Sequence, residues 1–278
     1  MKLFDARWLE APSVLTRLCL IGAGALLLAG CAAVAPVGTA GDGKTDVMTA
    51  SDEPEARRRA SIRLELAVSY FAEGKTTFAL DELKQALVID PTYAQAYNLR
   101  GLVYTRLNDF HLAEESFRRA MSLDPRDAGV VQNYGWLLCQ AGRFGEATDT
   151  FNRALANPQY RDRAKTYLTM GLCQAKAGQV EEAERSLGKS YELDAGNPIT
   201  GFNLASLLLK RGELVRAQFF IRRLNNSELA NAESLWLGIK VERRLDSLVA
   251  MQQLAEQLKK RFPQAREVSL YERGAFDE

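Results

Sequence analysis

The stretch GLVYTRLNDFHLAEESFRRAMSLDP, residues 101–125, contains five landmark residues that recur along the chain. They are Tyr104, Ala113, Phe117, Ala120 and Pro125. The same pattern stands 34 residues earlier, at Tyr70, Ala79, Leu83, Ala86 and Pro91. It continues 34 residues later with Leu138, Ala147, Phe151 and Ala154. A period of this length predicts stacked helical hairpins rather than one central core.

Three further copies extend the pattern to about residue 264. The fourth, after two additional residues near Arg161, has Tyr167, Gly171, Ala183 and Leu187, and the fifth has Ala205, Leu208, Ala217 and Ile221. The sixth copy is degenerate, with Gly238, Val241, Ala250 and Leu254. Glycines at positions 74, 142, 178 and 212 fall where each hairpin needs a turn, and Pro91 and Pro125 predict the ends of second helices.

The pattern resembles the tetratricopeptide repeat. The resemblance implies an all-α fold, a right-handed superhelix of about six helix-turn-helix repeats over residues 58–264, followed by a C-terminal cap or tail over residues 265–278. From the spacing we expect the small residues at 67, 101, 135, 171 and 205 to face the alanines at 79, 113, 147, 183 and 217. Large residues such as Phe117 and Phe151 would then fill the space between neighbouring repeats.

The first thirty residues have the pattern of an export signal. Basic residues precede an apolar run from Leu18 to Leu28, which is too short to span a bilayer as a helix. The run ends at Leu28-Ala29-Gly30-Cys31, which resembles the lipobox of bacterial lipoproteins and implies cleavage after residue 30 and acylation, including palmitate, of Cys31. An ordinary signal peptide or an uncleaved anchor is the alternative.

Residues 31–57 have no helical or strand period, and we expect a lipidated N-terminus followed by a flexible tether. Ala32 follows the cysteine, so the chain lacks the Asp that resembles an inner-membrane retention signal. These features predict an outer-membrane, lipid-anchored protein that faces the periplasm.

Two cysteines remain in the expected mature chain. Cys139 and Cys173 are 34 residues apart, at equivalent places in adjacent repeats. Because the periplasm is oxidising, a disulfide between them is one interpretation. Two separate buried thiols are the other.

The composition argues against catalysis and against nucleic-acid binding. The chain has 36 Lys and Arg, 35 Asp and Glu and one His, for a formal charge of +1. This balance gives no basic stripe for a phosphate backbone. His111 falls at a turn, without an orienting carboxylate or a nucleophile in a recognisable motif. We therefore expect no enzymatic activity, catalytic residue, metal, cofactor or small-molecule substrate.

The inner, concave face of such an array is the expected binding site for a protein segment. The period places the first helix of each repeat on this face. The predicted protein-binding groove contains Leu64, Phe71, Asn98, Gln132, Trp136, Leu168 and Phe202. Packing between adjacent first helices is the competing interpretation for the leucines.

Several segments resemble the type IV pilus biogenesis and stability lipoproteins of the PilW/PilF family. They are Asn133-Tyr134-Gly135-Trp136-Leu137-Leu138-Cys139, Asn157-Pro158-Gln159-Tyr160, Gly171-Leu172-Cys173, Leu235-Trp236-Leu237-Gly238-Ile239 and Arg261-Phe262-Pro263. The resemblance implies a pilotin-like role in twitching motility, in which the protein binds the outer-membrane secretin of the type IV pilus and helps to localise, assemble or stabilise it. An adaptor of outer-membrane protein assembly or of cell-wall hydrolases is the alternative.

Overall fold

The computed structural model describes residues 53–277, which fold into thirteen α-helices and, within that range, no β-strand. The predicted all-α fold is therefore confirmed. The predicted signal peptide, Cys31 and residues 31–52 of the predicted tether lie outside the described residues. Residues 55–57, which we assigned to the tether, instead begin the first helix.

Twelve helices form six consecutive antiparallel hairpins. They are α1 (Glu55–Ala72) with α2 (Thr76–Ile89), α3 (Ala94–Arg106) with α4 (Phe110–Leu123), α5 (Ala128–Gln140) with α6 (Phe144–Leu155), α7 (Arg163–Lys176) with α8 (Val180–Leu193), α9 (Pro198–Arg211) with α10 (Leu214–Asn225), and α11 (Ala232–Arg244) with α12 (Leu248–Arg261). We refer to these pairs as repeats one to six.

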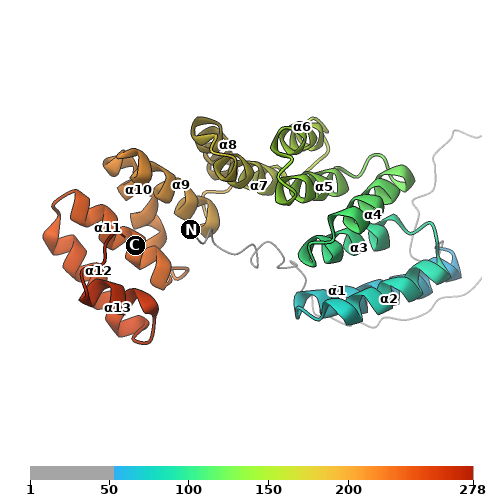
Figure 1. Ribbon diagram of the computed structural model, residues 1–278, viewed down its shortest axis with the longest axis horizontal. Coiled ribbons are helices and arrows are strands. Elements are labelled where there is room, and N and C mark those ends of the chain that lie inside the picture. The colour runs from blue at the N-terminus through green and yellow to red at the C-terminus, as the bar shows by residue number, and fades with distance from the viewer. Residues whose placement is uncertain (1–52, 278) are drawn as a thin grey trace, which may run out of the picture.

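The hairpins stack into an arch that runs from α1 and α2 at one end to α11, α12 and α13 (Arg266–Glu272) at the other (Figure 1). Contacts between repeats join α1 to α3, α3 to α5, α5 to α7 and α9 to α11. The odd-numbered helices thus form the inner layer of the superhelix, and the even-numbered helices form the outer layer. This arrangement agrees with the placement of the predicted groove on the first helix of each repeat.

Each hairpin turns at one residue with a positive φ angle. Gly74, Gly142, Gly178 and Gly212 have φ between 76° and 79°. In repeats two and six the same place is taken by Asn108, with φ 60°, and Asp246, with φ 54°. Asn and Asp tolerate this left-handed region better than most residues, which explains how two repeats turn without glycine.

At three crossings between the two helices of a repeat, a glycine of the inner helix contacts a large residue of the outer helix. A Cβ atom on Gly101 would lie 2.8 Å from the ring of Phe117, and one on Gly135 would lie 2.8 Å from the ring of Phe151. Gly171 approaches the side chain of Leu187 equally closely. Each glycine thus accommodates the large residue of its own repeat, a contact that the sequence did not predict. The expected pairing of these small residues with the alanines of the second helices stays a prediction.

The C-terminal segment forms a cap. Helix α13 contacts both α11 and α12, and Leu270 is 4% exposed in a cluster with Leu235, Ile239 and Leu258. Gly274, with φ 67°, then turns the chain so that the ring of Phe276 stacks on Trp236 with 5.4 Å between centroids. The sequence left open whether residues 265–278 form a cap or a tail. The described part of this segment forms a cap.

Candidate partner-binding surfaces

Three of the seven predicted groove residues are buried. Phe71, Gln132 and Leu168 are 5%, 4% and 1% exposed, respectively. Leu168 packs in the interior with Leu187 and Leu204, which belong to its own and the next repeat. A ligand could reach these three side chains only if their neighbours moved, so their assignment as exposed groove residues is corrected.

Phe71 is buried because the next repeat covers it. The guanidinium of Arg106 lies 3.7 Å from the centre of the Phe71 ring, and its Nη1 donates a 2.6 Å hydrogen bond to the Phe71 carbonyl. Arg244 makes an equivalent contact further along, where its Nη1 donates to the carbonyl of Leu209 at 2.8 Å. Arginines of the inner helices thus satisfy carbonyl groups at the C-terminal ends of the preceding inner helices.

The other four predicted groove residues, Leu64, Asn98, Trp136 and Phe202, are partly exposed. Asn98 is not a free amide, because its Oδ1 accepts a 3.1 Å hydrogen bond from Nδ2 of Asn133 in the next repeat. The amide pair bridges α3 and α5 across the inner layer. The bond to Asn133 uses Oδ1 of Asn98, so a partner would bind Asn98 through a hydrogen bond from its Nδ2 group.

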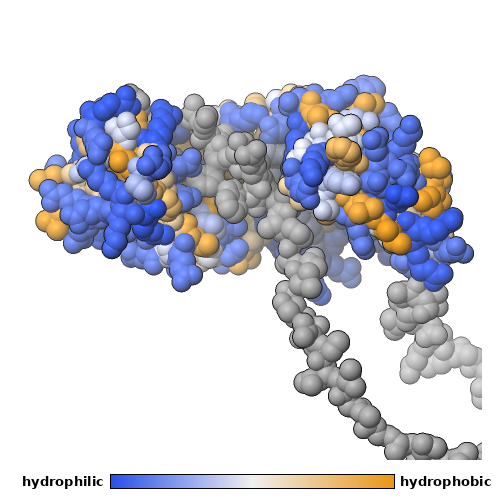
Figure 2. Space-filling model, turned by 90° about the horizontal axis from the view of Figure 1, so that it is seen from below, coloured by the Kyte–Doolittle hydropathy of each residue, from blue (hydrophilic) through white to orange (hydrophobic). Residues whose placement is uncertain are grey.

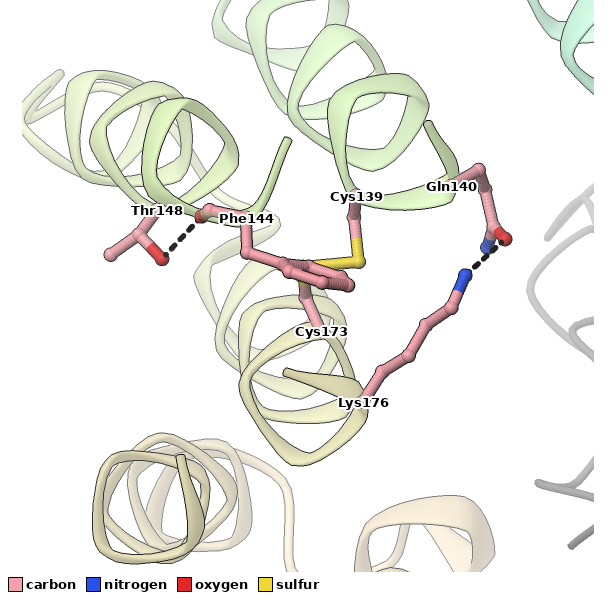
Figure 3. The surroundings of a disulfide bond; sticks show 6 residues. All are labelled: Cys139, Gln140, Phe144, Thr148, Cys173 and Lys176. Carbon is pink, nitrogen blue, oxygen red and sulfur yellow. Dashed lines mark hydrogen bonds between the residues drawn. A yellow bond between two sulfur atoms is a disulfide. The ribbon is translucent and has the colours of Figure 1, made fainter. Parts of the chain in front are cut away.

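Cys139 of α5 and Cys173 of α7 are joined by a disulfide in the structure, with their Cα atoms 5.8 Å apart. Figure 3 shows the bond between two inner helices, with the Phe144 ring nearby and the 3.2 Å hydrogen bond from Lys176 Nζ to Gln140 Oε1 beside it. Both sulfur-bearing side chains are buried, at 0% and 1% exposure. Formation of this bond in the exported protein stays a prediction.

The first repeat displays an apolar edge that the sequence analysis missed. Ile62 and Leu66 on α1 are 60% and 41% exposed. The equivalent residues of repeat three, Val130 and Tyr134, are 0% and 8% exposed because they pack against Phe117 and its neighbours in the preceding repeat. No repeat precedes α1 within the described residues, so Ile62 and Leu66 stay at the surface. We call Ile62 and Leu66, which lie one turn apart on the same side of the helix, the α1 edge. Val68, which is 42% exposed, lies on the groove side of α1 with Leu64.

The sequence contained a signal for the α1 edge. Residues that lie 34 or 68 positions apart along the array occupy equivalent places in different repeats. Their surroundings are equivalent except in the first and last repeats. Terminal repeats usually have a polar outer face that keeps the array soluble. Apolar residues at the exposed start of repeat one therefore indicate a surface that contacts another molecule.

The start of α1 is held against the loop that joins repeats one and two. Arg57 forms an ion pair with Asp90, its Nη2 donates to the Thr92 hydroxyl at 3.2 Å, and its guanidinium lies 4.4 Å from the centre of the Tyr93 ring. Burial acts to raise the pKa of Asp90, but the hydrogen bonds from Arg57 and Thr92 together hold that pKa below its usual value. The α1 edge is thus carried by a fixed helix.

An ionic cluster links repeats two and three on the outer side. Glu114 accepts hydrogen bonds from the Tyr134 hydroxyl at 2.8 Å, from Arg143 at 2.8 Å and from Arg118 at 2.7 Å. Burial acts to raise the pKa of Glu114, whereas these hydrogen bonds, with Tyr134 first, together hold it below its usual value. Every member of the cluster has a structural partner, and the cluster indicates no catalytic chemistry.

The described residues offer little for catalysis. His111 lies exposed in the first turn of α4 and not, as expected, in the turn before it. Residues 53–277 contain no group of three or more His, Cys, Asp or Glu that could hold a metal ion. None of the helices in that range is long and apolar enough to cross a membrane. The surfaces that remain as candidates are the inner groove and the α1 edge, both of which suit another protein.

Comparisons with known proteins agree with this fold. Models of the tetratricopeptide repeat match residues 69–108 and 94–127. The crystal structure of YrrB, a TPR protein described as having an unusual peptide-binding site, is 16% identical and superposes with a TM-score of 0.52 over 69% of this chain and 97% of that one. The chain is a tetratricopeptide-repeat protein, a class whose members bind protein partners.

Two relatives define the family more closely. The crystal structure of PilW, described as a widely conserved type IV pilus biogenesis factor, is 30% identical, with a TM-score of 0.68 over 77% of this chain and 98% of that one. The type IV pilus assembly protein PilF of Pseudomonas aeruginosa is 29% identical over 225 residues, which are 81% of this chain and 88% of PilF. A structure of P. aeruginosa PilF superposes with a TM-score of 0.66 at 28% identity, over 79% of this chain and all of that one. The chain belongs to the PilW/PilF family of type IV pilus biogenesis proteins.

Proposed function

We propose that this protein is a non-catalytic, acyl-anchored lipoprotein of the outer membrane that binds the pilus secretin and helps to localise, assemble or stabilise it. Its membership of the PilW/PilF family supports a role in type IV pilus biogenesis. The lipobox-like segment ending at Cys31 supports the anchor. Delivery of a bound partner to the membrane that holds the anchor would then follow from lipoprotein sorting.

The observation that carries the binding proposal is the α1 edge. Ile62 and Leu66 remain exposed, whereas their equivalents in repeat three, Val130 and Tyr134, are covered by the preceding outer helix α4. A secretin segment that forms an amphipathic helix could occupy this place and extend the stack by one helix. Such a helix would bury its apolar face against α1, as in other helix-in-groove complexes.

The partly exposed groove residues lie on the same inner layer. Leu64 belongs to α1, and Trp136 and Phe202 follow in repeats three and five. We propose that a longer partner segment continues from the α1 edge along these residues. Large aromatic side chains are frequent anchors of protein interfaces, so Trp136 is the first residue to test within the groove.

Affinity capture tests the proposal. The protein would be recovered from detergent-solubilised outer membranes, and the co-purified proteins identified by mass spectrometry. We expect secretin with the native protein and a marked loss with Ile62→Asp/Leu66→Asp, because the two carboxylates would prevent an apolar helix from docking. Recovery of outer-membrane assembly proteins or cell-wall hydrolases in place of secretin would support the alternative adaptor function.

A further inference from the structure

The outer face of α10 differs from the outer faces of the preceding repeats. Val215 and Phe219 lie one turn apart on this face and are 71% and 59% exposed. The equivalent pairs in repeats one to four are polar or small: Thr77 with Asp81, His111 with Glu115, Gly145 with Asp149, and Glu181 with Arg185. These two positions are exposed in each of the first five repeats. Of these five, only repeat five has large apolar side chains at both positions.

The apolar surface continues onto α12. Leu248 and Val249 at its start are 59% and 70% exposed. In repeat five, Arg216 at the equivalent of Val249 contacts the preceding outer helix, where its Nη2 lies 2.7 Å from the Glu184 carboxylate. Val249 occupies the equivalent position on α12, and Leu248 occupies the equivalent of Val215. We call Val215, Phe219, Leu248 and Val249 the apolar strip; Figure 2 shows hydrophobic side chains at the surface at the end of the array that α11 and α12 form.

Charge changes at the same boundary. From their Lys, Arg, Asp and Glu residues, the outer helices α2, α4, α6 and α8 have formal charges of −1, 0, −1 and −2. Helix α10 carries three arginines and no carboxylate, for +3, and α12 carries three basic residues and one acidic residue, for +2. Three of these six basic side chains are ion-paired with neighbouring carboxylates: Arg216 with Glu184 and Glu213, Arg222 with Glu242, and Lys259 with Glu272. Exposed apolar side chains and clustered positive charge are thus combined on the last two repeats.

We propose that the apolar strip is a second membrane contact, which seats repeats five and six on an anionic phospholipid surface. Its four side chains would enter the boundary between headgroups and acyl chains, and the exposed Arg223 of α10 and Lys260 and Arg261 of α12 would lie among the phosphates. The strip lies on the outer layer of the arch and its side chains protrude from it, a shape that suits a lipid surface. Because α10 and α12 carry a positive formal charge, the surface that they contact is expected to have anionic headgroups.

This contact would orient the array. The proposed acyl anchor precedes repeat one, and the strip lies on repeats five and six, so two contacts at opposite ends would lay the arch along the membrane. The α1 edge and the inner groove would stay open to a partner. The inference uses the membrane setting of the proposed function, but it does not depend on the identity of that partner.

A vesicle-binding experiment separates the strip from the anchor. The chain without residues 1–31 cannot be acylated. The PilW and PilF chains of solved structure superpose on 77–79% of this chain over 98–100% of their own lengths, which supports independent folding of that part. Co-flotation would compare vesicles of phosphatidylcholine with vesicles that contain about a third phosphatidylglycerol. We expect at least about tenfold stronger binding to the anionic vesicles at low salt, and weaker binding as salt rises.

Matched variants make the result specific. Val215→Ser/Phe219→Ser should lower binding to the anionic vesicles about tenfold, because two side chains no longer enter the lipid. The control Phe78→Ser/Val88→Ser removes two side chains that are 57% and 76% exposed on α2, and it should bind like the native chain. Thermal melts of the native chain and of both double variants would verify folding.

A second measurement reports how deeply the apolar strip enters the lipid. Tryptophan fluorescence of Phe219→Trp should be quenched by brominated phosphatidylglycerol, whereas that of Phe78→Trp should show no quenching beyond the native background. Absence of native binding, equal binding to both kinds of vesicle, or equal loss in the strip variant and its control would overturn the proposal. Strip-dependent capture of a protein without vesicle binding would also overturn it. None of these outcomes bears on secretin capture through the α1 edge.

Discussion

Gly135 and Phe151 contact each other so closely that a Cβ atom on the glycine would lie 2.8 Å from the phenylalanine ring. Phe151 is 0% exposed, so the ring has little room to move away. The same relationship joins Gly101 to Phe117 and Gly171 to Leu187. The approach of the inner helix to the outer helix in repeats two, three and four therefore depends on the absence of one side chain.

We predict that Gly135→Ala destabilises the array by about 1 to 3 kcal/mol, because the added methyl group overpacks a closed core. Gly145→Ala is the matched control, since Gly145 also lies in a helix but its Cβ atom would meet nothing within 4 Å. There the gain in helix propensity should stabilise the protein by up to about 1 kcal/mol. Urea unfolding measures both, and equal effects of the two substitutions would contradict the close-packing account.

We predict that the exported protein contains no free thiol from Cys139 or Cys173. Alkylation without reduction should leave its mass unchanged, and reduction first should allow two alkyl groups to add. Reduction should lower stability by roughly 3 to 4 kcal/mol according to the loop-entropy model for a 34-residue separation. Two alkylated cysteines in the untreated protein would show that the bond is absent.

Stability should fall in acid partly through Glu114. Its pKa is lower in the folded state than its usual value, so the carboxylate favours folding above the ordinary Glu pKa of about 4.3, and this contribution is lost as pH falls through and below that value. Glu114→Gln should remove about 0.5 to 1.5 kcal/mol at pH 7, where the hydrogen bonds to Tyr134 and Arg143 are intact, and less at pH 3.

The control for Glu114 is its neighbour Glu115, whose side chain is 61% exposed and lies 3.6 Å from Arg100. An exposed pair at this distance contributes little, so Glu115→Gln should leave the urea midpoint at pH 7 nearly unchanged. Should Glu114→Gln and Glu115→Gln behave alike at both pH values, the cluster around Glu114 would have no special role.

Replacement of Cys31 by Ser should release the protein from the outer membrane. The substitution removes the expected acylation site, and with it the acyl chains that hold the tether to the leaflet. Fractionation of envelopes and labelling with a palmitate analogue measure this. Continued acylation of the Cys31→Ser chain would contradict the proposed anchor.

The repeat pattern was sufficient to predict the hairpins and their turns. Each landmark residue acts within its own repeat, so Gly74 and Gly212 indicate turns without knowledge of the rest of the chain. The period also indicates which face of an inner helix points inward. It does not indicate which side chain of the next repeat covers that face, and this is why Phe71, under the guanidinium of Arg106, was wrongly placed in the open groove.

The ends of the array were the least predictable parts. Ile62 and Val130 occupy equivalent positions, and only the absence of a preceding repeat in the described chain makes one exposed and the other buried. At the other end, the stacking of Phe276 on Trp236 depends on a turn at Gly274 outside the repeat pattern. Both features arise from contacts between distant segments, which periodicity does not encode.

The most direct test of the account is the amount of secretin captured by the Ile62→Asp/Leu66→Asp protein relative to the native protein, measured from detergent-solubilised outer membranes. Val88→Asp is the control, because Val88 is 76% exposed on α2 and lies outside the α1 edge. We predict at least about a tenfold loss of secretin with the double variant and none with the control, since the carboxylates would be buried by a docked apolar segment. Undiminished secretin capture by a folded double variant would contradict the account.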